Sequence, residues 1–172
     1  MIFVTVGTQK FPFDRLLIEL DRLVHNQSIT DTVVAQRGYS TYIPKNYHSF
    51  DFLPAKEFAE YYDRSNILIT HSGTSSIIEG LKRLKKVIVV PRQKKYGEHV
   101  DNHQLEITNT FIEQNLVAAV IEINHLGNTI RSIENYSFVP YSFGSETLVK
   151  SVANYLSEIA MNNKGELKRV QR

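Results

Sequence analysis

The sequence has no cysteine among its 172 residues. This absence excludes a disulfide scaffold, a thiolate metal site and a cysteine nucleophile. No apolar run approaches the roughly 20 residues that span a bilayer, and the segment from Met1 to Gly7 lacks the basic start of a signal peptide. We therefore expect a mature chain that begins at Met1, with the cytoplasm as the favoured compartment.

Neither sign of charge is in large excess, because 20 Lys and Arg stand against 18 Asp and Glu, a net charge of +2. With 42% hydrophobic residues, the composition predicts one soluble domain and excludes disordered and fibrous classes. Positive charge gathers in residues 164–172 and in a cluster without acidic residues, which comprises Lys82, Arg83, Lys85, Lys86, Arg92, Lys94 and Lys95. Such a cluster is either a solvated surface or a site for phosphates, anionic lipid or nucleic acid.

Short apolar runs alternate with helical patterns along the chain. The predicted strands are 2–6, 32–36, 49–53, 66–70, 87–90 and 117–121, and the predicted helices are 14–24, 56–64, 77–84, 105–112 and 145–160. We expect Asp14 to cap the first helix. The alternation predicts an α/β fold, a Rossmann-like parallel sheet with helices on both faces, over residues 1–161, with a basic tail at 162–172.

Three polar segments follow predicted strands, at 7–10, 71–76 and 98–104. Ligands of such sheets bind beyond the carboxyl ends of the strands. Gly73, Thr74, Ser75 and Ser76 offer backbone amides and hydroxyls at the start of a helix, which suits a diphosphate, although a serine-rich start is also an ordinary helix cap.

Several familiar motifs are missing. The sequence has neither G-x-G-x-x-G after the first strand nor a P-loop, and neither G-x-S-x-G nor H-E-x-x-H. No two aspartates stand two positions apart, so the pair that would hold a divalent metal on a diphosphate is absent. We therefore expect no metal and no cofactor, with protein groups neutralising the phosphate charge.

Four segments together carry a resemblance to a known family: V-T-V-G-T-Q at 4–9, H-S-G-T-S-S-I-I-E-G at 71–80, V-I-V-V-P-R at 87–92 and D-N-H-Q at 101–104. They resemble the donor-binding half of glycosyltransferases related to the peptidoglycan enzyme that adds N-acetylglucosamine to lipid I, the glycosyltransferase family 28 C-terminal type. The resemblance covers about residues 1–160 and implies the C-terminal half of a glycosyltransferase B fold. It is closest to single-domain members, the catalytic subunit of dolichyl-diphosphate N-acetylglucosamine transferase and bacterial capsule and exopolysaccharide transferase subunits.

The resemblance also implies roles for individual residues. Glu79, six positions after Gly73, would hold a ribose, or it is a solvated helix residue. The phosphates would lie between Gly7 and Thr8 on one side and Ser72, Gly73, Thr74 and Ser75 on the other. Asp101, Asn102, His103 and Gln104 would face the sugar hydroxyls, although Asn102 or His103 could instead cap the following helix. His71 would touch the ligand or act as a structural hydrogen-bonding group.

The implied function is an inverting, metal-independent transfer of a hexose from a UDP-sugar to a polyprenyl-diphosphate-linked acceptor, in capsular or exopolysaccharide synthesis. Because the chain has one α/β domain, a membrane-associated subunit would bind the acceptor and hold the chain at the inner face of the membrane. That partner would supply the base, or Glu98 or His99 would act within this chain. Galactose and N-acetylglucosamine are the candidate sugars, and K-Y-G-E-H at 95–99 favours galactose.

Two alternatives belong to other classes of function. The chain could be a non-catalytic nucleotide-sugar-binding or scaffolding subunit. The basic cluster with Tyr39, Tyr42 and Tyr47 could instead form a nucleic-acid surface, because aromatic side chains beside positive charge stack on bases. We expect no nucleic-acid partner. An apolar stripe within 145–160 predicts packing on the domain's own core or on the partner.

Overall fold

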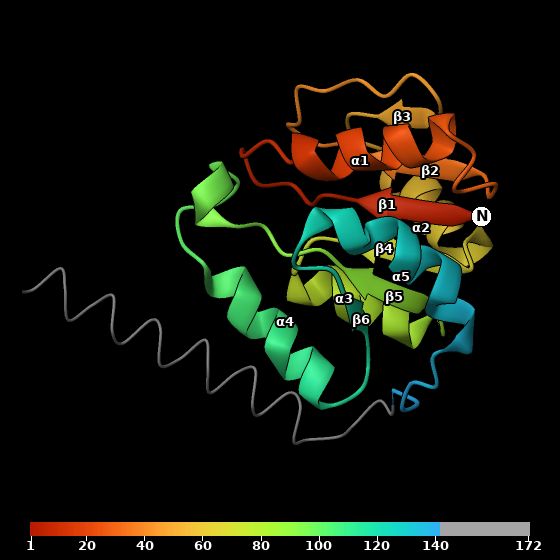
Figure 1. Cartoon of the computed structure of the whole chain (residues 1–172), viewed down its shortest axis with the longest axis vertical. Helices are drawn as coiled ribbons and strands as arrows, with labels where there is room; N and C mark the ends of the chain where they lie inside the picture. The colour runs from red at the N-terminus through yellow and green to blue at the C-terminus, as the bar shows by residue number, and fades with distance from the viewer. Residues whose placement is uncertain (142–172) are drawn as a thin grey trace, which may run out of the picture. The chain divides into compact units, whose positions relative to one another are not determined.

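The computed structural model describes residues 1–141, which contain one sheet of six parallel strands in the order β3-β2-β1-β4-β5-β6 (Figure 1). The strands are β1 (Ile2–Thr5), β2 (Val33–Gln36), β3 (His48–Phe50), β4 (Ile67–Thr70), β5 (Lys86–Val89) and β6 (Ala118–Ala119). The predicted α/β parallel fold is confirmed. The predicted helix at 145–160, the domain end at 161 and the tail at 162–172 lie outside the described residues.

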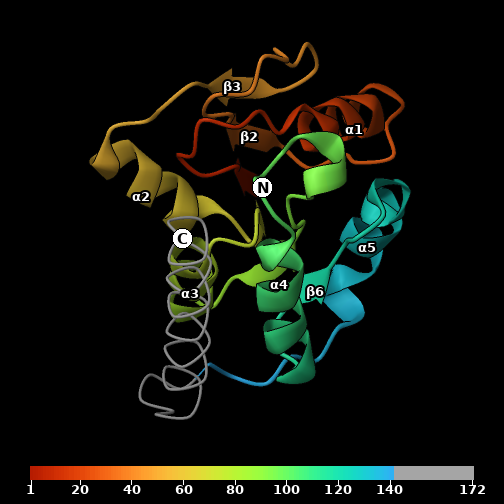
Figure 2. The same ribbon diagram turned by 90° about the vertical axis from the view of Figure 1, so that its left-hand side faces the viewer.

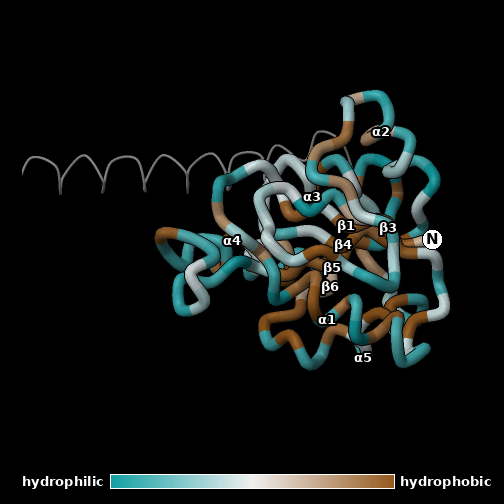
Figure 3. Tube along the Cα trace, turned by 90° about the horizontal axis from the view of Figure 1, so that it is seen from above, coloured by the Kyte–Doolittle hydropathy of each residue, from teal (hydrophilic) through white to brown (hydrophobic). Residues whose placement is uncertain are grey.

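Five α-helices accompany the sheet: α1 (Asp14–His25), α2 (Ala55–Arg64), α3 (Thr74–Lys82), α4 (His103–Glu113) and α5 (Leu126–Ser132). Figure 3 shows α1 and α5 on one face and α2 and α3 on the other, and α4 contacts β6. Strands β1, β2 and β4 are buried along their whole length and rich in β-branched residues, because helices cover both faces of the sheet, whereas the edge strand β3 is largely exposed. The hydrophobic strands are therefore enclosed, as the hydropathy colouring shows.

The sequence did not predict α5, which has only seven residues and contains Gly127. A weak signal was present, since Leu126, Ile130 and Ile133 are spaced four and three apart and all three are buried. The prediction that Asp14 caps α1 is wrong. Phe13 is the N-cap, and the Asp14 carboxylate accepts hydrogen bonds from the backbone amides of Thr41 (2.9 Å) and Tyr42 (3.0 Å) in the loop after β2.

The sheet places β1 beside β4 at its centre, with Thr5 opposite Thr70. From β1 the chain runs outward to β3, and from β4 it runs outward to β6, so these two strands lie at opposite ends (Figure 2). The direction in which the chain crosses the sheet therefore reverses between β1 and β4, and the loops that follow these two strands diverge at this switch point. Such a point is where ligands bind in open α/β sheets.

Candidate functional site

A cavity of about 460 Å³ opens at the carboxyl ends of β1 and β4. Ten of the predicted site residues line it: Gly7, Thr8, His71, Ser72, Gly73, Thr74, Ser75, His99, His103 and Gln104. The structure adds Thr5, Gln9, Gln36, Phe58, Ser76 and Ile107. Three polar segments that are distant in sequence therefore meet at one place, as their positions after predicted strands suggested.

The wall of the cavity is neutral. Its lining includes no Asp, Glu, Lys or Arg of residues 1–141. Helix α3 begins here with Gly73 as its N-cap, no side-chain capping hydrogen bond and no acidic residue in its first turn. The first-turn amides and the positive end of the helix dipole are thus available to an anion.

His71 occupies the space between two glycines. Its side chain is buried, and its Nδ1 lies 3.3 Å from the hydroxyl of Thr70. A Cβ atom added to Gly7, whose φ is +80°, would lie 2.5 Å from the imidazole, and one added to Gly73 would lie 2.3 Å from its Nε2. The imidazole thus requires a glycine on both sides, and it fixes the distance between the turn after β1 and the start of α3.

Burial, reinforced by the nearby charge of Arg92, lowers the pKa of His71 to about 4. The imidazole is therefore neutral near pH 7 and brings no positive charge to the cavity. It is a hydrogen-bonding wall group that is also in reach of a ligand, so both roles considered for it fit its position.

Gln104 connects α4 to the ends of β4 and β5. Its buried amide oxygen accepts hydrogen bonds from the backbone N–H of Arg92 (2.9 Å) and of Ser72 (3.3 Å). Thr108 Oγ1, one turn further along α4, lies 2.9 Å from the Ser72 hydroxyl. Gln104 thus lines the cavity while its oxygen holds two neighbouring loops together.

Arg92 is a buried clamp between the loops. Its Nη1 donates to the carbonyl oxygens of Phe11 (2.8 Å), Pro12 (3.3 Å) and Glu98 (3.1 Å), and its Nη2 donates to that of Val6 (2.6 Å). Burial lowers the pKa of Arg92 to about 10, against the opposing charge of Glu98, so the guanidinium stays protonated near pH 7. It fixes the β1–α1 loop against the β5–α4 loop.

The structure does not bring Glu98 to the cavity. Its buried carboxylate forms a two-point ion pair with Arg15 Nε (2.9 Å) and Nη2 (3.0 Å) and accepts the backbone N–H of Gln93 (3.0 Å). The sequence placed Glu98 and His99 together as candidate bases, but adjacent residues in an irregular loop point in different directions. Glu98 therefore has a structural role, because its carboxylate is occupied by Arg15 and Gln93.

His99 does line the cavity, and an aspartate orients it. Its Nδ1 lies 2.8 Å from Asp101 Oδ1, and the same oxygen accepts the backbone N–H of His103 (3.0 Å) at the start of α4. The Phe11 ring lies 5.9 Å from the imidazole. The backbone N–H of Asp101 also lies 3.3 Å from Nδ1, so Asp101 contacts this nitrogen through both its carboxylate and its amide. In the tautomer that carries its proton on Nδ1, Nε2 is a proton acceptor.

Besides Glu98, three more predicted site residues, Glu79, Asp101 and Asn102, lie outside the lining of the cavity. The Glu79 carboxylate accepts a hydrogen bond of 2.5 Å from Arg83 Nε, and it stands one helical turn beyond the lining residue Ser75. Asn102 is the N-cap of α4, but its side-chain oxygen accepts the backbone N–H of Lys94 (3.1 Å) and makes no capping hydrogen bond.

The sequence analysis missed Gln36 and Phe58. Gln36 ends β2 directly beside Thr5, and Phe58 lies on α2. The only available signal was the position of Gln36 as a polar residue at the end of a strand. Phe58 gave no signal, because an aromatic residue on an amphipathic helix is typical of core packing.

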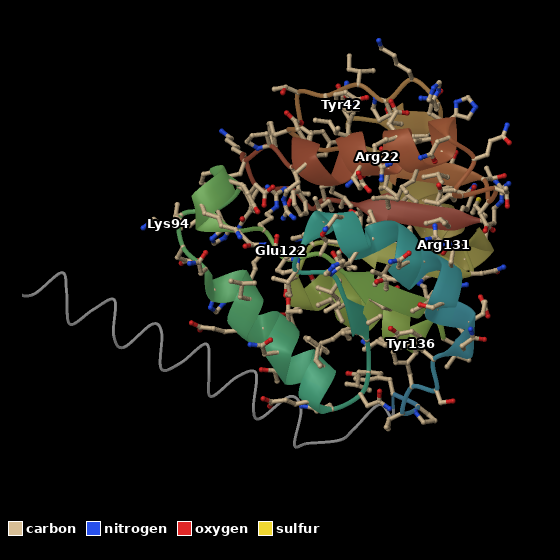
Figure 4. All side chains as sticks on the ribbon, in the orientation of Figure 1. Arg22, Tyr42, Lys94, Glu122, Arg131 and Tyr136 are labelled. Atoms are coloured by element: carbon tan, nitrogen blue, oxygen red, sulfur yellow. The ribbon has the colours of Figure 1, made fainter. Side chains whose placement is uncertain are left out.

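The basic cluster at 82–95 is not one charged surface. Arg92 is buried, Lys85 donates to two backbone carbonyls, and Lys94 points outward (Figure 4). Ion pairs also join Arg83 to Glu79 and Asp63, Lys86 to Glu134 and Lys95 to Glu122. Two of the tyrosines considered for base stacking are also engaged, because Tyr42 donates to Asp21 and Tyr47 to the Leu17 carbonyl.

Residues 1–141 contain no group of three or more His, Asp or Glu side chains placed to hold a metal ion. None of the helices in this part of the chain has both the length and the apolar character needed to cross a membrane.

The model of the glycosyltransferase family 28 C-terminal domain matches residues 1–159. The chain belongs to this family. No curated protein matches the sequence. Among solved structures, the NMR structure of ALG13 has 21% identity and a TM-score of 0.57, and the match covers 88% of this chain and 93% of that one.

Two longer proteins share the fold. The glycotransferase of kitacinnamycin has 12% identity and a TM-score of 0.57, with 89% of this chain and 37% of that chain covered. MurG of Acinetobacter baumannii has 13% identity and a TM-score of 0.54, with 77% and 41% covered. This family 28 domain thus spans less than half of either protein, and these likenesses show that they share its fold.

We expect Gly73→Ala to lower the free energy of unfolding by roughly 1 to 3 kcal/mol, because the new methyl group overlaps the His71 imidazole. Urea unfolding of Gly73→Ala, His71→Ala and the double variant measures the coupling between the two sites. The cost of Gly73→Ala should be smaller in the His71→Ala background. Gly97→Ala is the control: its added Cβ meets nothing within 4 Å, so its cost comes from the left-handed backbone at φ +70° and should be the same in both backgrounds. Equal costs in both backgrounds would show that the imidazole does not impose the glycine.

Proposed function

We propose that this chain is the donor-binding catalytic subunit of an inverting, metal-independent glycosyltransferase that uses a UDP-sugar. The observation that carries the proposal is the neutral cavity at the β1–β4 switch point, where the uncapped start of α3 meets the hydroxyls of Thr8, Thr74 and Ser75, in a chain of family 28. Hydroxyls and helix-start amides are suitable donors for the oxygens of a diphosphate.

The donor would lie along the first two turns of α3. The diphosphate would occupy the cavity between Thr8 and the start of the helix. The ribose would reach Glu79, because residues four apart share one helix face and Ser75 lines the cavity. A carboxylate can accept hydrogen bonds from two ribose hydroxyls. When the donor binds, the Glu79 carboxylate would give up its hydrogen bond from Arg83 and accept those of the ribose. The sugar would face His103, Gln104 and the nearby Asp101 and Asn102.

In the proposed reaction, a hydroxyl of the acceptor attacks the anomeric carbon from the side opposite the UDP. The bond between that carbon and the diphosphate oxygen breaks, and its electron pair leaves with UDP. The hydroxyl proton passes to a base. His99, oriented by Asp101, is the candidate within this chain, whereas Glu98 is occupied by Arg15; a partner subunit is the other source of the base.

A second, membrane-associated chain would complete the site and present a polyprenyl-diphosphate-linked sugar. The proposal is supported by the likeness to ALG13, because the match covers 93% of that chain, whereas the matches to the two longer proteins cover 37% and 41% of theirs. Such a partner would hold the chain at the cytoplasmic face of the membrane. The donor would be UDP-galactose or UDP-N-acetylglucosamine, and the product a capsular polysaccharide or exopolysaccharide.

A thermal-shift panel of UDP-sugars tests the donor directly, because a ligand that binds the native state raises the melting temperature. We expect UDP and either UDP-galactose or UDP-N-acetylglucosamine to stabilise the purified chain. A radiolabelled transfer assay, with and without the partner, then tests catalysis. Transfer should require both chains. Binding without turnover in the complex would favour the scaffolding alternative, and efficient transfer by the chain alone would contradict the two-subunit proposal.

For Glu79→Ala, we expect UDP binding to weaken by roughly 1.5 to 3 kcal/mol, the range for hydrogen bonds to a charged group. Calorimetric titration with UDP gives the change, and Glu113→Ala, another helix glutamate at the far end of α4, is the matched control. An affinity for UDP equal to that of the parent chain would remove Glu79 from the ribose site.

His99→Gln should reduce kcat of the complete enzyme by roughly 10²- to 10⁴-fold, the usual contribution of a general base. The affinity for UDP should change little, because the imidazole is proposed to act on the acceptor. Asp101→Asn should give a smaller loss of kcat and an altered pH profile, since it changes the orientation of the ring. His125→Gln, an exposed histidine, is the control. A kcat unaffected by His99→Gln would assign the base to the partner.

A further inference from the structure

Three charged side chains form a buried group beside the cavity, which we call the charge triad: Arg15, Glu98 and Arg92. The side chains of Arg15 and Glu98 are 13% and 4% exposed and form the ion pair described above. Arg92 is fully buried and has no ion pair within residues 1–141; its guanidinium donates to backbone carbonyls alone. Two cations and one anion leave the triad with a net charge of +1.

The triad is joined to the cavity wall at three points. Arg92 Nη2 donates to the carbonyl of Val6, the residue before Gly7. The backbone N–H of Arg92 donates to the Gln104 side chain, and Glu98 directly precedes His99. The charge of Arg92 also contributes, after burial, to the low pKa of His71. Its field therefore reaches the wall of the cavity.

The net charge of the triad is incompletely compensated within the described part of the chain. Arg15 Nη1 and Arg92 Nε are both buried without a hydrogen-bond partner there. A buried charge of this kind is costly in free energy unless an opposite charge lies nearby. An anion in the cavity would reduce that cost, and the cavity lining itself has no charged residue to oppose or replace it.

We propose that the net positive charge of the triad gives the cavity its preference for a diphosphate, acting through space and not by contact. This inference rests on the proposed function and deepens it. The hydroxyls and amides of the wall would hold the phosphate oxygens, while the triad and the start of α3 provide the positive potential. Because UDP gains negative charge as the glycosidic bond breaks, the same field would favour its departure.

The ion pair offers a test that separates charge from structure. Arg15→Met and Glu98→Gln both break the same pair, so a purely structural role predicts changes of the same sign. They alter the triad in opposite ways, however, to a net charge of zero in Arg15→Met and of +2 in Glu98→Gln. The measured quantity is the ratio of the dissociation constants of uridine and UDP, obtained by NMR titration of the full chain.

We expect the preference for UDP over uridine to fall roughly three- to tenfold in Arg15→Met and to rise by a similar factor in Glu98→Gln. Arg22→Met and Glu19→Gln, which break an exposed ion pair on α1, should leave the ratio unchanged. Arg92→Lys, which keeps the charge but not the fork of donors, should preserve the preference better than Arg92→Met. If Arg15→Met does not fold, Arg15→Gln and the rise in Glu98→Gln carry the test.

Changes of the same sign in Arg15→Met and Glu98→Gln, with UDP still bound by the parent chain, would overturn this inference alone. A parent chain that binds UDP no better than uridine would overturn the proposed function together with it. Opposite changes in the two variants, with unchanged exposed-pair controls, would establish the triad as the source of the preference.

Discussion

The site depends on one buried guanidinium. Arg92 donates to carbonyls at Val6, Phe11, Pro12 and Glu98, which belong to loops more than 80 residues apart in sequence. These bonds tie the two loops together, and the contact of the Phe11 ring with His99 adds to them. A lysine could not replace it, because an ammonium lacks the planar fork that satisfies several carbonyls at once. The clamp joins the turn after β1, at Val6, to the loop that carries His99, at Glu98.

A second constraint on the site is steric. The His71 imidazole separates the turn at Gly7 from the start of α3 at Gly73. A neutral ring suits this position, because a protonated one would add a second buried positive charge close to Arg92. Burial and, after it, the charge of Arg92 both lower the pKa of His71. The cavity lining thus has no Asp, Glu, Lys or Arg within residues 1–141, and the charge of Arg92 is buried outside that lining.

The sequence predicted the six strands and helices α1 to α4 along the chain, because a parallel sheet covered on both faces leaves a strong pattern of short apolar runs. It also located the cavity, since each polar segment that lines it follows a strand. The pairing of Glu98 with Arg15 was not predictable, because it joins residues 83 positions apart. Gln36, Phe58 and the clamping role of Arg92 were hidden for the same reason: their partners are set by tertiary contacts, which no local spacing encodes.

The charge triad is easier to explain by ligand binding than by the stability of the fold. Apolar residues of similar volume often stabilise a protein when they replace a buried ion pair, so the triad is a poor way to build a core. Arg15 and Arg92 each retain a buried N–H without a described partner, which adds to that cost. In our proposal, a buried net positive charge beside the start of α3, which has no side-chain cap, serves an anion and not packing alone. The positive potential of such a site is present before the ligand binds. Little reorganisation of the protein is then needed when negative charge develops on the leaving group.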